Sequence, residues 1–288
     1  MNIRIILAPL FGSDADATAL PGAMGLAQRF QAHVQGLFVR TDPMDAVPII
    51  GEGVSPAVIT QLTEAAKVEI ERQWRAAKGA FEAACVRTGV TVTDRPGDGG
   101  AASAELVDAS GRRDDVIPRR ARLSDLVVFG RSQADEPIDL RSIVESTLLD
   151  GGRPLLLMPH GHSGEVGRSV AIAWNGSVQA AHAVAGAMPV LRDATSVHIL
   201  TAETRRTAFE RSAELARYLA WHGVESTPRQ VTVGDDSVGA SLLRTVAEAG
   251  ADLLVMGGYG RTRLSELVMG GVTRHVLSEA TVPVLLAH

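Results

Sequence analysis

The chain has little of the chemistry that marks specialised classes of protein. It contains one cysteine, Cys85, among 288 residues, so an internal disulfide framework is excluded. Cys85 lies in an alanine-rich helical pattern, where cysteine is usually a small buried apolar residue. No run of about 20 apolar residues is present, which predicts that no helix spans a membrane. We therefore expect a globular protein of a reducing compartment, the cytoplasm.

Basic residues are not in excess either. Lys and Arg number 28 against 33 Asp and Glu, and the formal net charge is −5 at pH 7. Nucleic acids and anionic membranes require a local basic surplus, and the sequence shows no basic stripe. We expect neither a nucleic acid nor a membrane as partner.

The sequence contains an internal repeat. Residues 5–20 are similar to residues 170–184, because each segment is an apolar run that ends in Gly-Ser and enters an alanine-rich helix. Further similar pairs follow in the same order along the chain. This predicts a tandem duplication, with one domain over residues 1–160, a glycine-rich polar linker, and a second domain over residues 166–288.

Another pair in the repeat joins DRPGDGGAASAELV to TVGDDSVGASLLRTV, which aligns Gly97 with Gly234 and Leu106 with Leu243. This alignment predicts a helix after GDGGAA. The same stretch matches the dinucleotide pattern G-x-G-x-x-A, but as a lone match that does not follow the first strand it is the weaker alternative.

Both halves alternate short apolar runs with helical patterns. Consecutive apolar residues suit strands that are covered on both faces, and strand–helix alternation implies a parallel sheet with right-handed crossovers. We predict an α/β fold of two tandem Rossmann-like domains, each with a five-stranded parallel sheet between helices. The strands expected in the second half are residues 170–173, 197–200, 229–233, 253–256 and 284–286.

The stretch GGYGRTRLSELVMGG, residues 257–271, directly follows one of these strands. In open α/β sheets, ligands bind at the carboxyl ends of strands, where glycine allows the backbone to come close to them. A helix is expected to begin after the stretch, with Thr273 in its first turn, and its unpaired N–H groups would favour an anion. The pattern predicts a polyphosphate site, and the alternative interpretation is a pair of tight turns without a ligand.

This stretch resembles the nucleotide loop of the universal stress protein family, whose pattern is Gly, two residues, Gly, nine residues, Gly, then Ser or Thr. Gly257, Gly260 and Gly270 satisfy it in order. ILAPLFGS and VAIAWNGS also resemble the family's first strand, so the resemblance covers both halves, as in tandem members. It implies an adenine nucleotide alpha hydrolase-like fold and ATP, AMP or ADP as ligand, with Mg²⁺ as an accompanying ion.

The resemblance also implies a role for each site residue. The three loop glycines would approach the phosphates together with the N–H groups of Gly271 and Val272. Arg261 would either neutralise phosphate charge or be a solvated side chain, and both interpretations stay open. Asn175 stands where the family's aspartate contacts the nucleoside, and Ala202 stands where its second strand meets adenine. The implied nucleotide-binding residues are Asn175, Ala202, Gly257, Gly260, Arg261, Gly270, Gly271, Val272 and Thr273.

The sequence departs from the family pattern in both halves. In the second half, Gly271 replaces the usual Ser or Thr and Asn175 replaces Asp, which predicts weaker binding, with Thr273 as a substitute hydroxyl. In the first half, Phe11 occupies the aspartate position and Gln133 replaces the second loop glycine. Acidic residues also stand where phosphates would need neutralising: Asp135, Glu136 and Asp139. We expect this half to have lost nucleotide binding and to serve as an interaction partner for the other half.

The favoured hypothesis is a tandem universal stress protein that binds an adenine nucleotide in its C-terminal domain and acts as a stress-response sensor or regulator. Its halves would form a pseudo-dimer, and a homodimer is left open. The alternative is a nucleotide-free interaction module with both sites degenerate, and an enzyme is a weaker third hypothesis. No catalytic residue is placed by the sequence, slow ATP hydrolysis stays open, and His160 and His162 are expected to be solvated rather than metal ligands.

Overall fold

A computed structural model describes residues 2–46, 56–95, 100–131, 140–162, 164–202, 208–234, 236–259 and 271–288. The N-terminal half contains β1 (Ile5–Leu10), α1 (Asp14–Phe30), β2 (His33–Arg40), the 3-10 helix η1 (Pro43–Ala46), α2 (Pro56–Thr88), β3 (Thr91–Val92), β4 (Ser103–Ser110), α3 (Arg113–Ala121), β5 (Leu126–Gly130), α4 (Leu140–Asp150) and β6 (Leu155–Met158). The C-terminal half contains β7 (Ser169–Ala173), α5 (Val178–Asp193), β8 (Ser196–Ala202), α6 (Ala208–Trp221), β9 (Thr227–Val231), α7 (Val238–Glu248), β10 (Leu253–Gly257), α8 (Gly271–Glu279) and β11 (Val284–Ala287).

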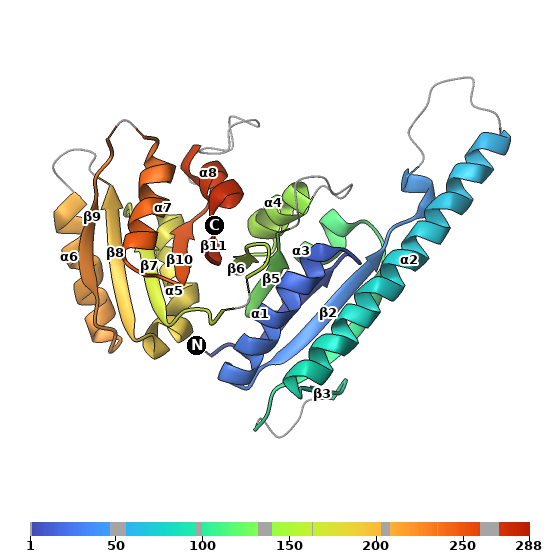
Figure 1. Cartoon of the computed structure of the whole chain (residues 1–288), viewed down its shortest axis with the longest axis horizontal. Helices are drawn as coiled ribbons and strands as arrows, with labels where there is room; N and C mark the ends of the chain where they lie inside the picture. Colours follow the sequence, from blue (N-terminus) through green and yellow to red (C-terminus); the bar gives the residue numbers. More distant parts are fainter. Residues whose placement is uncertain are drawn as a thin grey trace.

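The strands of both halves form one continuous sheet of 11 strands in the order β3-β4-β2-β1-β5-β6-β11-β10-β7-β8-β9 (Figure 1). All pairs within each half are parallel, and the halves join through the antiparallel pair β6–β11, where Leu156 lies opposite Leu285. The strands predicted for the second half are all present, which confirms the α/β prediction. The first half repeats their order and adds the short edge strand β3.

Helices cover both faces of the sheet and define one core on each face. The first core packs α1, α2, α5 and α6 against the sheet through side chains such as Phe81 and Leu219. The second packs α3, α4, α7 and α8 through side chains such as Ile117 and Val276. Because neighbouring strand residues point into different cores, both faces require apolar side chains. This explains the consecutive apolar runs in the sequence.

The repeated Gly-Ser pair has the same structural role in both halves. Gly12 and Gly176 have φ angles of 71° and 72°, in the left-handed region that favours glycine. The next residue caps the following helix: the hydroxyl of Ser13 accepts a hydrogen bond from the Ala15 amide, and that of Ser177 accepts one from the Ala180 amide. The repeat is therefore a strand-to-helix turn that is built twice.

The structure contradicts one pair of the repeat. Leu106 lies in strand β4 whereas Leu243 lies in helix α7, so the predicted alignment and the predicted helix after GDGGAA are wrong. Residues Ser103–Ser110 instead pair along their full length with β2. Pairing in the sheet overrides the local helical preference of this segment, and the dinucleotide alternative loses the helix that it required.

The structure bears on the expectations about Cys85 and about membrane-spanning helices. Cys85 is 5% exposed in the first core, and burial raises the pKa of its thiol, as expected of an inert packing residue. Within the described ranges, no helix has both the length and the apolar character needed to cross a membrane.

Candidate functional site

A pocket of about 340 Å³ lies at the carboxyl ends of strands in the C-terminal half. This volume is within the range of about 300–1,000 Å³ typical of ligand sites. Its lining residues are Ala173, Trp174, Asn175, Ser177, Gln179, Leu200, Thr201, Ala202, Arg211, Val231, Val238, Leu242, Met256, Gly257, Gly271, Val272 and Thr273. They come from four strands and from helices α6, α7 and α8, together with the start of α5.

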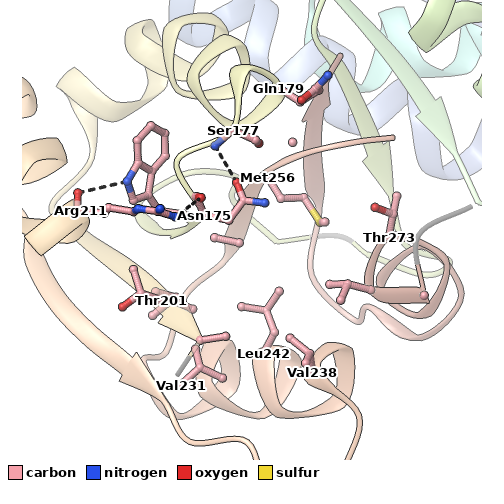
Figure 2. Close-up of a pocket in the computed structure, with 17 residues that line it drawn as sticks. Asn175, Ser177, Gln179, Thr201, Arg211, Val231, Val238, Leu242, Met256 and Thr273 are labelled. Atoms are coloured by element: carbon pink, nitrogen blue, oxygen red, sulfur yellow. Dashed lines mark hydrogen bonds between the residues drawn. The ribbon is translucent and has the colours of Figure 1, made fainter. Parts of the chain in front are cut away.

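One side of the pocket is apolar and the opposite side is polar. Figure 2 shows Val231, Val238 and Leu242 across the pocket from Ser177 and Gln179. The apolar side chains come from β9 and α7, which close the pocket away from the β7–α5 turn. An apolar wall facing a few polar groups is the usual composition of a site for a flat organic ligand with a polar end.

Asn175 shapes the polar side through the turn that leads into α5. Its Oδ1 accepts a hydrogen bond from the Ser177 amide at 3.0 Å, which forms an Asx turn. This hydrogen bond fixes the orientation of the side-chain amide. Asn175 therefore presents a neutral amide at the pocket, where an aspartate would present a charged acceptor.

Helix α6 is tied to the same turn by a pair of hydrogen bonds. The indole Nε1 of Trp174 donates to the Arg211 carbonyl at 3.1 Å, and the Arg211 guanidinium donates to the Asn175 carbonyl at 3.3 Å. Trp174 packs against the first core and also lines the pocket. Arg211 was missed by sequence reasoning because it belongs to no motif, and it reaches the pocket only through the packing of α6.

Two of the predicted loop glycines have different surroundings. A Cβ atom on Gly257 would lie 2.6 Å from the Ala180 amide nitrogen and 2.7 Å from the Gln179 carbonyl carbon, so the first turn of α5 requires glycine there. A Cβ on Gly271 would meet nothing within 4 Å. Gly257 is therefore needed for strand–helix packing, whereas a side chain would be accommodated at Gly271.

The structure brings many of the predicted binding residues together. Asn175, Ala202, Gly257, Gly271, Val272 and Thr273 all line this pocket. Thr273 lies in the first turn of α8, as predicted, and is only 7% exposed. Gly260, Arg261 and Gly270 lie outside the described residues, as do Gln133, Asp135, Glu136 and Asp139 of the first half. That any of these residues binds a ligand stays a prediction.

The described residues of the pocket do not fit a metal site. They include no carboxylate, imidazole or thiol. No group of three or more His, Cys, Asp or Glu side chains that could hold a metal occurs anywhere in the described ranges. The residues present thus supply no ligand set for Mg²⁺ beyond what a bound phosphate would bring.

At the equivalent place in the N-terminal half, side chains fill the space. Phe11 is 2% exposed and stacks on Phe129 with ring centroids 6.3 Å apart. The guanidinium of Arg113 lies 5.7 Å from the Phe11 ring centroid and donates to the Gln73 side chain. Burial lowers the pKa of Arg113, which is opposed by the attraction of Asp16. Phe11 holds the place in the first half that Asn175 holds beside the pocket in the second, one residue before the Gly-Ser pair.

The fold and this pocket together define a two-domain α/β protein with a ligand-type site at the carboxyl edge of one half. Residues 168–288 match the family model described as the universal stress protein family. This part of the chain therefore belongs to that family, and the residues before it share the family's fold. Among curated proteins, no sequence matches the chain.

Solved structures agree over the whole length. A universal stress protein from Archaeoglobus fulgidus DSM 4304 matches with a TM-score of 0.70 and 17% identity, covering 98% of this chain and 97% of that one. A protein described as a universal stress protein from Pseudomonas aeruginosa UCBPP-PA14 matches with a TM-score of 0.55 and 16% identity, covering 99% and 93%. A universal stress protein in complex with cAMP covers 57% of this chain, with a TM-score of 0.35 and 16% identity. That last likeness says nothing about the ligand of this chain.

Proposed function

We propose that the C-terminal half, residues 166–288, binds ATP or a related adenine nucleotide, and that the chain acts as a stress-response sensor or regulator. The observation that carries the proposal is the pocket at the carboxyl ends of β7, β8 and β10, with an apolar wall on one side and the start of α8 on another. Family membership of this half supports the same conclusion.

The pocket offers distinct surroundings to the two ends of a nucleotide. Adenine is flat and largely apolar, so the wall of Val231, Val238 and Leu242 suits it. The phosphates suit the first turn of α8, where Gly271, Val272 and Thr273 begin the helix and the unpaired N–H groups favour negative charge.

Binding without rapid turnover is the activity that these residues support. The described lining residues provide no carboxylate or imidazole that could activate a water molecule. The positive end of a helix holds an anion but does not remove a proton from an attacking group. We therefore propose a nucleotide-binding role, with slow hydrolysis as a quantity to be measured during the binding experiment.

We propose that the N-terminal half, residues 1–160, does not bind nucleotide. The buried cluster around Phe11 supports this, because its rings and the Arg113 guanidinium stand where a ligand would have to lie. The chain would then bind one nucleotide and use its first half as a structural partner.

Isothermal titration of the purified chain with ATP, ADP and AMP tests the proposal. We expect saturable binding with one site per chain. Ala202 is partly buried at the end of β8 and lines the pocket, so Ala202→Phe should place a ring in the pocket and weaken binding by about tenfold or more.

The matched control is Ala220→Phe, which adds the same ring at an exposed position of α6. It should bind as the wild type does. Wild-type protein that shows no saturable binding, and carries no nucleotide when its native mass is measured, would instead support a nucleotide-free interaction module. Equal binding by wild type and Ala202→Phe would remove this pocket as the site.

A further inference from the structure

The N-terminal half contacts the elements that border the glycine-rich stretch of the C-terminal half. On the sheet face that carries the second core, α4 and α8 lie on either side of the β6–β11 junction (Figure 1). Tyr259 follows β10, and α8 begins at Gly271. Tyr259 and α8 each form a hydrogen bond with a side chain of the first half, across the β6–β11 junction.

The first contact joins Tyr259 to α4. The Tyr259 hydroxyl donates a hydrogen bond to the Glu145 carboxylate at 3.0 Å, and Glu145 also pairs with Arg141 at 3.5 Å. Burial, and to a lesser extent the Glu145 charge, raise the pKa of Tyr259 above its usual value. The hydroxyl therefore stays protonated and remains a donor at every physiological pH.

The backbone beside this contact is held in an uncommon conformation. Tyr259 has φ of 57°, which places a non-glycine residue in the left-handed region. Its neighbour Gly258 packs closely on α4, because a Cβ there would lie 2.9 Å from a methyl carbon of Leu148. Such a conformation persists only where the surroundings fix it. Here Gly258 is bonded to the backbone of β11 through Ala287, and Glu145 and Leu148 of the other half supply the contacts on the α4 side.

The second contact joins the first half to α8. Arg131 follows β5, and its guanidinium donates to the Leu277 carbonyl at 3.1 Å. Leu277 lies in the same helix as Val272 and Thr273, which line the pocket. A group of the N-terminal half thus holds the helix whose first turn faces the pocket.

We propose that Glu145 and Arg131 are positioning residues through which the N-terminal half sets the ligand affinity of the C-terminal pocket. Glu145 acts through Tyr259, and Arg131 acts through α8. As far as it concerns affinity, this inference rests on the proposed nucleotide binding. It gives the half with the filled site a regulatory role, because a partner or modification that shifted α4 would be felt at the pocket of the other half.

The test measures ATP affinity by calorimetry and, without ligand, hydrogen exchange of residues 254–259 and 271–279. Glu145→Ala and Tyr259→Phe should each weaken ATP binding by about two- to tenfold, the effect of one lost hydrogen bond. Each should also speed exchange in residues 254–259. The double variant should be no weaker than the single variants, because both remove the same bond. Arg131→Met should weaken binding to a similar extent and speed exchange in α8.

Two controls separate positioning from general destabilisation. Glu145→Gln keeps an acceptor oxygen and should retain most of the wild-type affinity. Glu71→Ala removes a different carboxylate of the first half. Glu71 lies on helix α2 and pairs with Arg40 of β2, and its loss should leave ATP affinity and both exchange segments unchanged. Unfolding midpoints of all variants show whether any loss of affinity follows a loss of stability.

The outcomes distinguish this inference from the proposed function. If wild type binds ATP and the Glu145, Tyr259 and Arg131 variants bind equally well, the positioning role is overturned. If wild type binds no ATP, the proposed function fails, and exchange alone decides the coupling. Faster exchange in the two segments then supports it, and unchanged exchange overturns it.

Discussion

Phe11 and Asn175 occupy the same position in the two halves, one residue before the Gly-Ser pair that starts the first helix. Phe11 is buried in a cluster with Phe129, whereas Asn175 is exposed at the edge of a pocket. The glycine that follows has the same left-handed conformation in both halves, with φ of 71° and 72°, although the capping serines differ in φ (−130° for Ser13 and −79° for Ser177). One scaffold therefore carries either a filled or an open site, and the side chains decide which.

The helix that follows β2 or β8 strengthens the contrast. In the first half, α2 has 33 residues, and its Gln73 backbone lies against Gly12, where a Cβ would come within 2.2 Å of the Gln73 oxygen. In the second half, α6 has 14 residues, and the nearest atoms to a Cβ on Gly176 belong to the Arg211 side chain at 3.4 Å. The longer helix covers the turn with backbone, and the shorter one leaves room beside it.

The largest loss of unfolding free energy should come from Phe11→Ala. Removing a fully buried aromatic ring costs about 3–5 kcal/mol of unfolding free energy through lost burial and the cavity left behind. Asn175→Ala, at the equivalent exposed position, should cost about 1 kcal/mol or less, because it removes only one hydrogen bond of the turn. Urea unfolding followed by fluorescence measures both. Similar losses for the two variants would contradict the assignment of one site as filled and the other as open.

A smaller loss of stability is expected when the glycines that end β5 and β10, Gly130 and Gly257, are replaced by alanine. A Cβ on Gly130 would lie 2.0 Å from the Ala15 carbonyl oxygen, just as one on Gly257 would approach Ala180. Gly130→Ala and Gly257→Ala should each destabilise the fold by about 1–3 kcal/mol, with the larger loss at Gly130 because its contact is shorter.

Thermal unfolding in the absence of nucleotide provides the measurement for this pair. A loss of stability at both glycines would show that the position is required by packing in both halves, including the half with no open site. If Gly257→Ala unfolded at the wild-type temperature, glycine at that position would have to be explained by ligand approach alone.

The smallest expected effect is a change of ATP affinity on replacing Gly271, where the family pattern has Ser or Thr. The space around its Cβ direction is open, so Gly271→Ser should fold normally and add a hydroxyl at the start of α8. One added hydrogen bond to a phosphate should tighten ATP binding by at most about tenfold. Gly271→Ala adds the carbon without the hydroxyl and serves as the control. Calorimetry that finds equal affinity for the serine and alanine variants would place the phosphates elsewhere.

Much of the architecture could be predicted because it depends on local patterns. Apolar runs between helical patterns identified every strand of the second half, and the Gly-Ser pairs marked two strand-to-helix turns. The alignment of Leu106 with Leu243 failed because the segment around Leu106 has a local helical preference, which its pairing with β2 overrides.

The pocket residues Asn175 and Ala202 were identified through the family resemblance and not through local patterns. Asn175 follows β7, Ala202 ends β8 and Thr273 lies in the first turn of α8, and the fold brings all three to the pocket. That they bind a ligand stays a prediction. Arg211 was not found, because it belongs to no motif and reaches the pocket only through the packing of α6. The packing role of Gly257 was also hidden, because a glycine that faces a helix and one that faces a phosphate have the same place in the motif.

The sequence by itself determined the alternation of strands and helices and the duplication, because these follow from hydrophobic period and from glycine and serine at turns. Only the tertiary structure decided that the halves share one sheet, that Phe11 and Arg113 pack together, and that Glu145 and Arg131 contact Tyr259 and α8. These contacts join residues far apart in the chain. Their formation depends on how whole elements pack, which no local pattern of residues records.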